Sequence, residues 1–423
     1  MQSSGENWNT LIRSIATFEH DPKALKFDSL ELGDDGDWNR SAYRLLAGIV
    51  RNHTLLVHSL NQFAAKPPKG TLRGYLLLGI YQLFEAREEV SRLPKIVHHT
   101  VGLVRKECSA REANFANAVL RKISGSVHNL LDELEKKQRW NILYSHPQWL
   151  IERWREAFGE ADTLALLKWN QQVPQLYVHD VTGYLETEAG RSAVEEHGLQ
   201  STSWPGFYKV PKGGIRRLLE LPLYVQDPST AIAPNLLADS LRGDILDACA
   251  APGGKALELH KLLGSAEGII HATDRDAGRV QMIKKNIHRL NADRIRTYIC
   301  DWETDIRPEE LPAQFDCALV DAPCSSVGII QKHPEIRWRL KPSDYEILPR
   351  QQLHILEAVS QAVKPGGKLV YSTCSIDPAE NTEVIKAFLA TDSGKLYRLM
   401  KEISCLPHHT GHDGVGAALL QRS

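Results

Sequence analysis

The sequence predicts a multidomain protein with an all-α front, a small α+β subdomain and a doubly wound α/β domain at the C-terminal end. Three observations predict it. The chain has 423 residues, more than one ordinary hydrophobic core takes up. From about residue 11 to 123 apolar residues recur at intervals of three and four, as on amphipathic helices. After about residue 230 short β-rich runs alternate with helical stretches, which is typical of an α/β sheet.

The front of the chain, residues 1–145, is predicted to be a bundle of amphipathic helices. Periodic runs such as "YRLLAGIVRNHTLLVHSL" are interrupted at "KPPKG" (66–70) and "SRLP" (91–94). The longest apolar stretch, "YLLLGIYQLF" (75–84), is far shorter than the ~20 residues that a membrane span needs. The N-terminus lacks the charged start and apolar core of a secretory signal. We therefore expect a cytoplasmic protein with no membrane partner.

Charge is unevenly distributed along this chain. The net charge is −1, yet residues 51–150 carry 15 Lys and Arg against 8 Asp and Glu. A basic helical region on a neutral chain is a candidate surface for phosphates. An ordinary solvated helix face gives the same pattern, so the charge leaves both readings open.

Residues 146–229 are predicted to form the small α+β subdomain. A helical segment, "PQWLIERWREAF", precedes two short strand patterns, "QLYVHDV" and "LPLYVQD". Turn residues lie between these segments, in "WPGF" and "PKGG".

Residues 230–423 are predicted to form the doubly wound domain. Its strand patterns are "DILDACA", "GIIHATD", "RTYICD", "DCALVDAP" and "KLVYSTC". Helical stretches between most of them imply parallel strands with right-handed crossovers. Ligands of such sheets bind at the carboxyl ends of the strands, so one crevice is expected to collect the residues found there. These are Asp247, Asp274, Asp301, Asp321 and Cys374.

Two cysteines, Cys324 and Cys374, end two of these strands. A metal site, a disulfide, a redox pair, a nucleophile and plain packing all compete as explanations. The chain has seven cysteines, an odd number, and no CxxC, which disfavours a disulfide framework, a zinc ribbon and a thioredoxin-type site. The 17 histidines show no metal spacing such as HExxH, so we expect no metal.

The turn "DACAAPGGKALEL" (247–259) carries the cofactor prediction. It is neither a Walker A loop nor a GxGxxG fingerprint, but its small residues let a ligand approach the backbone ahead of a helix. Asp274 is placed to accept a ribose diol and Asp301 to meet an adenine edge. This combination without a phosphate cradle favours S-adenosylmethionine over NAD. The predicted cofactor-binding residues are Cys249, Ala250, Ala251, Pro252, Gly253, Gly254, Lys255, Asp274, Asp301 and Asp321.

Several motifs together resemble a known family. "CAAPGGK", "DAPCS", "HPEIRW" and "STCS" followed by "PAEN" resemble the cytosine-C5 RNA methyltransferases of the Nol/Nop/Sun superfamily. The helical front, with "YLLLGIYQL" and "NFANAVLRKI", is similar to NusB-like domains. The combination resembles the bacterial Sun/Fmu (RsmB) branch, which methylates a cytosine of 16S ribosomal RNA. The resemblance implies a NusB-like RNA-binding domain and a Rossmann-like methyltransferase domain that uses S-adenosylmethionine.

The resemblance also implies catalytic roles. Cys374 would be the nucleophile that adds to C6 of cytosine, which makes C5 reactive. Cys324 would assist removal of the C5 proton and product release. Asp321 would bind the N3/N4 edge of the base, and Lys255 would steady that acid. A free thiol titrates near ~8.5, so Cys374 needs a nearby cation or helix N-terminus to become a thiolate.

The expected partner is 16S ribosomal RNA, either naked or in a small-subunit assembly intermediate, bound by a monomer. Lys332, Arg337 and Arg339 are further candidates for contacts with RNA phosphates. Two alternatives stay open: the same chemistry on tRNA or large-subunit RNA, and a non-catalytic RNA or protein scaffold. The chain departs from the family pattern at Val415-Gly416, where an aromatic pair is usual, at "VHDV" (178–181) and at Ala256.

Overall fold

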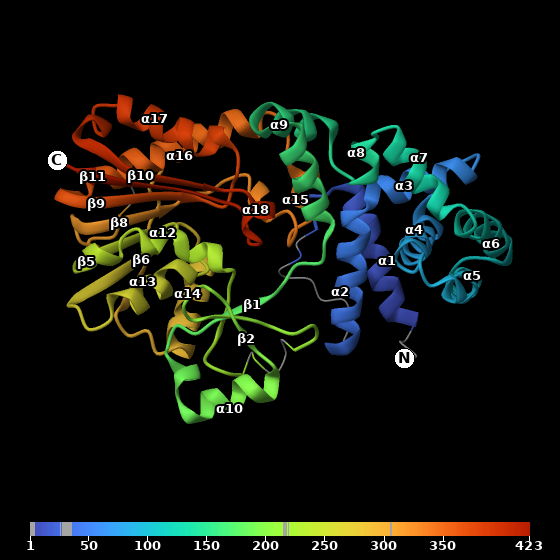
Figure 1. The fold of residues 1–423 in the computed structure, drawn as a ribbon, viewed down its shortest axis with the longest axis horizontal. Helices are drawn as coiled ribbons and strands as arrows, with labels where there is room; N and C mark the ends of the chain where they lie inside the picture. The colour runs from blue at the N-terminus through green and yellow to red at the C-terminus, as the bar shows by residue number, and fades with distance from the viewer. Residues whose placement is uncertain (1–4, 26, 28–35, 215–217, 219, 305–306) are drawn as a thin grey trace. The chain divides into compact units, whose positions relative to one another are not determined.

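A computed structural model gives the fold and describes residues 5–25, 27, 36–214, 218, 220–304 and 307–423 (Figure 1). The chain divides into two compact units. The first consists of Met1–Gln172 and Ile330–Leu340, and the second of Val173–Ile329 and Lys341–Ser423. Within the described residues, every helix is too short or too polar to cross a membrane.

The first unit is a helical bundle, as the periodicity predicts. Its α-helices are α1 (Gly5–His20), α2 (Gly36–Arg51), α3 (His53–Phe63), α4 (Gly70–Glu85), α5 (Leu93–Glu107), α6 (Ala110–Ser124), α7 (Val127–Lys136), α8 (Trp140–Leu143) and α9 (Gln148–Gln171). The apolar stretch 75–84 lies in α4, which contacts α1, α2, α3, α5 and α6. Since α4 is covered on all sides, it is apolar all round.

The segment Ile330–Leu340 belongs to this helical unit although it lies between two elements of the second unit in the chain. Arg337 is fully buried and donates hydrogen bonds to the main-chain carbonyls of Arg51, Tyr144, Ser145 and Asn170. These carbonyls lie at helix C-terminal ends, where a cation is favoured. The prediction that Arg337 contacts RNA phosphates is therefore wrong: its guanidinium is spent on carbonyls of the protein.

The second unit begins with a small antiparallel sheet of four strands in the order β2-β3-β1-β4. The strands are β1 (Tyr177–His179), β2 (Gln200–Ser201), β3 (Phe207–Lys209) and β4 (Tyr224–Val225), with α10 (Glu188–His197) between β1 and β2. His179, in the departure "VHDV", is buried against the ring of Phe207 at 3.9 Å. Its Nδ1 lies 3.0 Å from Gln226 Oε1 and its Nε2 3.1 Å from Glu258 Oε2. Both of its ring nitrogens are thus engaged within the protein.

A seven-stranded sheet forms the rest of the second unit, in the order β10-β11-β9-β8-β5-β6-β7. Its strands are β5 (Gly243–Ala248), β6 (Gly268–Asp274), β7 (Ile295–Ile299), β8 (Phe315–Asp321), β9 (Val363–Thr373), β10 (Tyr397–Cys405) and β11 (Val415–Arg422). The five predicted strands are confirmed as the parallel part, β5 to β9. The sheet is mixed, however, because β11 runs antiparallel to both β9 and β10.

Helices cover both faces of this sheet, as a doubly wound fold requires (Figure 1). One face packs on α12 (Ile232–Asn235), α13 (Gly254–Leu263) and α14 (Ala277–Arg289), and the other on α16 (Asp344–Gln361) and α17 (Thr382–Ala390). The chain runs outward from β5 to β7 and then returns to the other side of β5 as β8. This reversal makes a switch point between β5 and β8, where such sheets bind ligands.

Candidate active site

The turn after β5 leads into α13 and has an unusual backbone. Cys249 and Gly253 have φ of +60° and +109°, and the second of these favours glycine. A Cβ on Gly254 would lie 2.7 Å from Gln226 Nε2, so a side chain there would displace that amide. Ala256, a departure from the family pattern, is fully buried in the apolar core beneath the turn. The small residues therefore keep the turn close to its neighbours and leave its backbone near the strand ends.

Asp274 ends β6 beside this turn and is 2% exposed. Its Oδ1 accepts the Asp276 N–H at 3.0 Å, and its Oδ2 lies 3.2 Å from Arg279 Nη1. Arg279 Nη2 also donates to the carbonyl of Ala251 at 2.7 Å, so this arginine ties the turn to the acid. Asp274 Oδ2 accepts no hydrogen bond from the described residues. It is a buried acceptor that suits a hydroxyl donor such as a ribose.

Two further acids stand at strand ends. Asp301 follows β7, is half-buried, and accepts the Glu303 N–H at 3.0 Å with Oδ1. Asp247, in β5, is fully buried, and burial together with the charge of Asp321 raises its pKa well above the usual range. Asp301 therefore has one carboxylate oxygen engaged at the edge of the crevice, whereas Asp247 favours its neutral form beneath it.

Lys255, at the start of α13, forms an ion pair with Asp321 at the end of β8. Its Nζ lies 2.7 Å from Asp321 Oδ2, and Asp321 Oδ1 accepts the Ser372 hydroxyl at 3.0 Å. Burial alone would lower the pKa of Lys255, but the charge of Asp321 and the hydrogen bond to it raise it. Lys255 is therefore a cation, held at the floor of the site next to a carboxylate of fixed orientation.

The two strand-end cysteines meet in the structure. Cys324 Sγ lies 3.3 Å from Cys374 Sγ, and the Ser326 hydroxyl lies 3.3 Å from Cys374 Sγ. Both thiols are free and half-buried. A hydrogen bond from Cys324, one from Ser326 and the charge of Lys255 lower the pKa of Cys374, against the effects of burial and Asp321. The same thiol–thiol bond, together with burial, raises the pKa of Cys324 well above the usual range. Cys374 is thus the thiolate of the pair and Cys324 holds the proton.

The structure brings together the predicted catalytic residues and places the predicted cofactor residues around the same strand ends. Sequence reasoning missed three residues that shape this site: Arg279, Ser326 and Glu380. Ser326 and Glu380 lie inside quoted motifs, "DAPCSS" and "PAEN", and their polarity next to buried strands was the available signal. His333 lies in the helical unit, where its Nδ1 is 3.5 Å from Glu335 Oε1.

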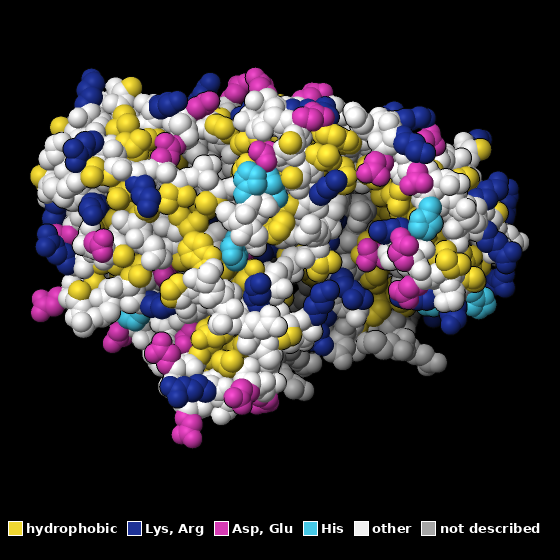
Figure 2. Space-filling model, in the orientation of Figure 1, with side chains coloured by type: hydrophobic (Ala, Val, Ile, Leu, Met, Phe, Trp, Pro, Cys, Tyr) yellow, Lys and Arg dark blue, Asp and Glu magenta, His cyan; other side chains and the backbone are white. Residues whose placement is uncertain are grey.

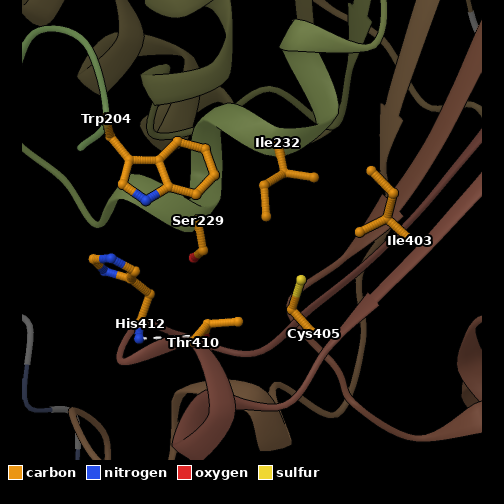
Figure 3. Close-up of a pocket in the computed structure, with 7 residues that line it drawn as sticks. All are labelled: Trp204, Ser229, Ile232, Ile403, Cys405, Thr410 and His412. Atoms are coloured by element: carbon orange, nitrogen blue, oxygen red, sulfur yellow. Dashed lines mark hydrogen bonds between the residues drawn. The ribbon is translucent and has the colours of Figure 1, made fainter.

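A small cavity of about 250 Å³ lies elsewhere in the second unit (Figure 3). It is lined by Trp204, Ser229, Ile232, Ile403, Cys405, Thr410 and His412. Figure 3 shows Trp204 and Ile232 facing Thr410 and Cys405 across it. Burial raises the pKa of Cys405, so this thiol stays neutral. No acidic side chain lines the cavity, which therefore lacks the acceptor that a ribose needs.

The fold and the site together define the class of protein. A doubly wound sheet, a small-residue turn, a buried ribose acceptor and a thiolate beside a second thiol are the parts of an S-adenosylmethionine-dependent methyltransferase with two active-site cysteines. Residues 235–421 match the model of the family described as 16S rRNA methyltransferase RsmB/F, and residues 20–125 match the NusB family.

Individual relatives agree with the family models. The chain is 31% identical to ribosomal RNA small subunit methyltransferase B of Proteus mirabilis, over 89% of each chain. It is also 31% identical to the protein of that name from Shewanella oneidensis, over 85% of this chain and 83% of the relative. The chain therefore belongs to the 16S rRNA methyltransferase RsmB/F family. It is an RNA methyltransferase that uses S-adenosylmethionine.

Solved structures support the fold. That of PH0851 covers 100% of both chains with a TM-score of 0.74 and 24% identity. That of NSun6 from Pyrococcus horikoshii covers 65% of this chain and 98% of its own, with a TM-score of 0.56 and 19% identity. At these identities the likeness concerns the fold alone.

Proposed function

We propose that the protein methylates C5 of one cytosine in 16S ribosomal RNA through a covalent bond between Cys374 and C6 of the base. The observation that carries this proposal is the pair of thiols 3.3 Å apart with opposite pKa shifts. Packing cysteines need no such asymmetry, whereas covalent catalysis needs one thiolate and one proton carrier.

S-adenosylmethionine, held by the turn 249–254 and by Asp274 and Asp301, supplies the methyl group. The buried, unfilled acceptor Asp274 Oδ2 supports this assignment, because a ribose hydroxyl satisfies it. Asp321 faces the base and Lys255 holds Asp321 in place. We propose the roles of these residues from their geometry together with the family resemblance.

The chain's own residues account for both halves of the reaction. Cys374 Sγ forms a bond to C6 and the ring becomes an enamine whose C5 takes the methyl group. The charge of Cys374 then disappears, and with it two of the causes that raise the pKa of Cys324. Cys324 can now lose its proton and take the one on C5. The electron pair of that C–H bond re-forms the double bond between C5 and C6, and Cys374 leaves as a thiolate.

The helical unit is proposed to hold the RNA around the target. Exposed basic side chains on α5 and α6 and just before α5 are Arg92, Lys95, Arg105, Lys106, Arg111, Arg121 and Lys122. Figure 2 shows dark blue side chains gathered on the part of this unit that carries these helices. Such a surface binds phosphates without reading sequence. The target cytosine itself must be unstacked to reach the strand ends.

The finer parts of the assignment belong to the same proposal: a cytoplasmic monomer with domains at 1–145, 146–229 and 230–423, acting on naked RNA or on an assembling small subunit. Bisulfite sequencing of total RNA from cells with the gene, without it, and with the Cys374→Ala variant tests the function. We expect one 16S cytosine to lose its signal in both mutant strains. A lost signal in tRNA or large-subunit RNA would transfer the chemistry to that substrate, and an unchanged profile would favour the scaffold.

A further inference from the structure

Glu380 is a buried carboxylate for which the reaction described above has no role. It ends the short helix η7 (Pro378–Glu380) after β9 and is 0% exposed. A buried charged group is costly unless its partners compensate it, so its contacts show what it stabilises. Those contacts reach the loops that carry both cysteines.

The carboxylate of Glu380 holds the loop of Cys324 on its C-terminal side. Oε1 accepts the Ser325 N–H at 2.8 Å, and Oε2 accepts the Ser325 hydroxyl. Gln352 Nε2 donates to Oε1 at 3.0 Å and also to the carbonyl of Pro323 at 2.9 Å. Glu380 and Gln352 therefore fix the residues immediately before and after Cys324.

The same residue is tied to the loop of Cys374. The main-chain carbonyl of Glu380 accepts the Tyr371 hydroxyl at 2.6 Å, and Tyr371 lies in β9, the strand that ends just before Cys374. Ser375, the residue after Cys374, places its hydroxyl 3.3 Å from that of Ser325. Glu380 thus lies where the two loops meet, and their relative position sets the distance between the thiols.

The charge of Glu380 acts on the thiol pair from one side. Oε1 faces two N–H groups that can only donate, so this oxygen is an acceptor. Lys255 from α13 acts on Cys374 from the other side, while Asp321 from β8 and Tyr371 from β9 are the other titratable groups around the pair. The negative charge of Glu380 adds to the causes that raise the pKa of Cys324.

We infer that Glu380 is a positioning residue that seats the Cys324 loop against the Cys374 loop and keeps the shared proton on Cys324. The inference rests on the proposed covalent function for its consequence in catalysis. The division of protons between the two thiols is measurable without RNA or cofactor.

The test compares thiol reactivity in the wild type and in Glu380→Gln, which keeps the size of the side chain and removes its charge. Iodoacetamide reacts with thiolates, so the ratio of Cys374 to Cys324 labelling, read by mass spectrometry, reports where the proton resides. We expect labelling of wild-type protein at Cys374 and a ratio about tenfold lower in Glu380→Gln, equivalent to one pKa unit. Methylation should slow while S-adenosylmethionine affinity stays unchanged.

Two variants separate charge from packing. Ser325→Ala removes one hydrogen bond to Oε2 but leaves the charge, so its labelling ratio should match the wild type. Glu380→Asp keeps the charge with a shorter reach; its ratio should also stay near the wild type, although methylation falls. If Glu380→Gln does not fold, Glu380→Asp decides the question by itself.

An unchanged ratio in folded Glu380→Gln, or an equal shift in Glu380→Asp or Ser325→Ala, would overturn the inference. Because labelling requires no substrate, failure of the proposed function has a different signature. In that case wild-type protein lacks cytosine methylation in RNA while the labelling ratio still depends on the charge at position 380.

Discussion

Replacing Asp274 with Asn should weaken S-adenosylmethionine binding without unfolding the protein. Asp274 is 2% exposed, and its Oδ1 accepts the Asp276 N–H, which an asparagine oxygen can still do. Its Oδ2, the acceptor assigned to the ribose, becomes an NH₂ group that faces Arg279 instead. The change therefore removes one charged acceptor and leaves the side-chain volume unchanged.

The expected loss follows from the kind of bond removed. A hydrogen bond to a charged partner contributes about 1.5–3 kcal/mol. The dissociation constant should therefore rise about 10- to 150-fold. Isothermal titration calorimetry of the wild-type and Asp274→Asn proteins with S-adenosylmethionine measures it directly.

Asp276→Asn is the matched control. Asp276 lies two residues further on and caps α14 by accepting the Arg279 N–H at 2.8 Å, a role that asparagine also performs. Its substitution should leave the affinity unchanged. Unchanged affinity in folded Asp274→Asn, or an equal loss in Asp276→Asn, would refute the assignment of Asp274 to the ribose.

Two other predictions concern charge. Lys255→Met removes the cation that lowers the pKa of Cys374, so the thiolate should disappear at a higher pH as the pH falls; the pH at half-maximal labelling of Cys374 should rise, whereas Lys261→Met on the same helix should leave it unchanged. RNA affinity of the full chain should fall steeply with salt, and replacing Arg105, Lys106, Arg121 and Lys122 by serine should flatten the slope by about 0.7–0.9 per lost phosphate contact. Serine at Lys395, on the second unit, is the control, and an equal slope in both proteins would remove α5 and α6 from RNA binding.

Local patterns in the sequence were enough to predict the parallel strands and the convergence of their ends. Cys324 and Cys374 are 50 residues apart in the chain, yet each directly follows an apolar strand, and parallel neighbours place such residues together. The helical front was equally accessible, because its periodicity is strong and its breaks carry proline and glycine.

Other features depend on contacts between distant segments, which no local pattern encodes. Strand β10 has mostly exposed residues, so it lacks the apolar alternation that marks β8 and β9. The burial of Arg337 depends on carbonyls about 170 to 290 residues earlier in the chain. Glycine at 416, where the family pattern has an aromatic residue, also has a distant cause: a Cβ there would lie 2.0 Å from Asn381 Oδ1.

The covalent mechanism is tested most directly by electrophoresis under denaturing conditions, with 16S RNA and S-adenosylmethionine present. Cys324→Ala should form the bond to C6 and accept the methyl group but fail to lose the C5 proton, so it should accumulate as a denaturant-stable protein–RNA adduct. Cys374→Ala should give no adduct and no methylation while still binding the cofactor. An adduct from Cys374→Ala in place of Cys324→Ala would exchange the two roles. Absence of adduct from both variants, with full methylation by Cys374→Ala, would contradict the mechanism.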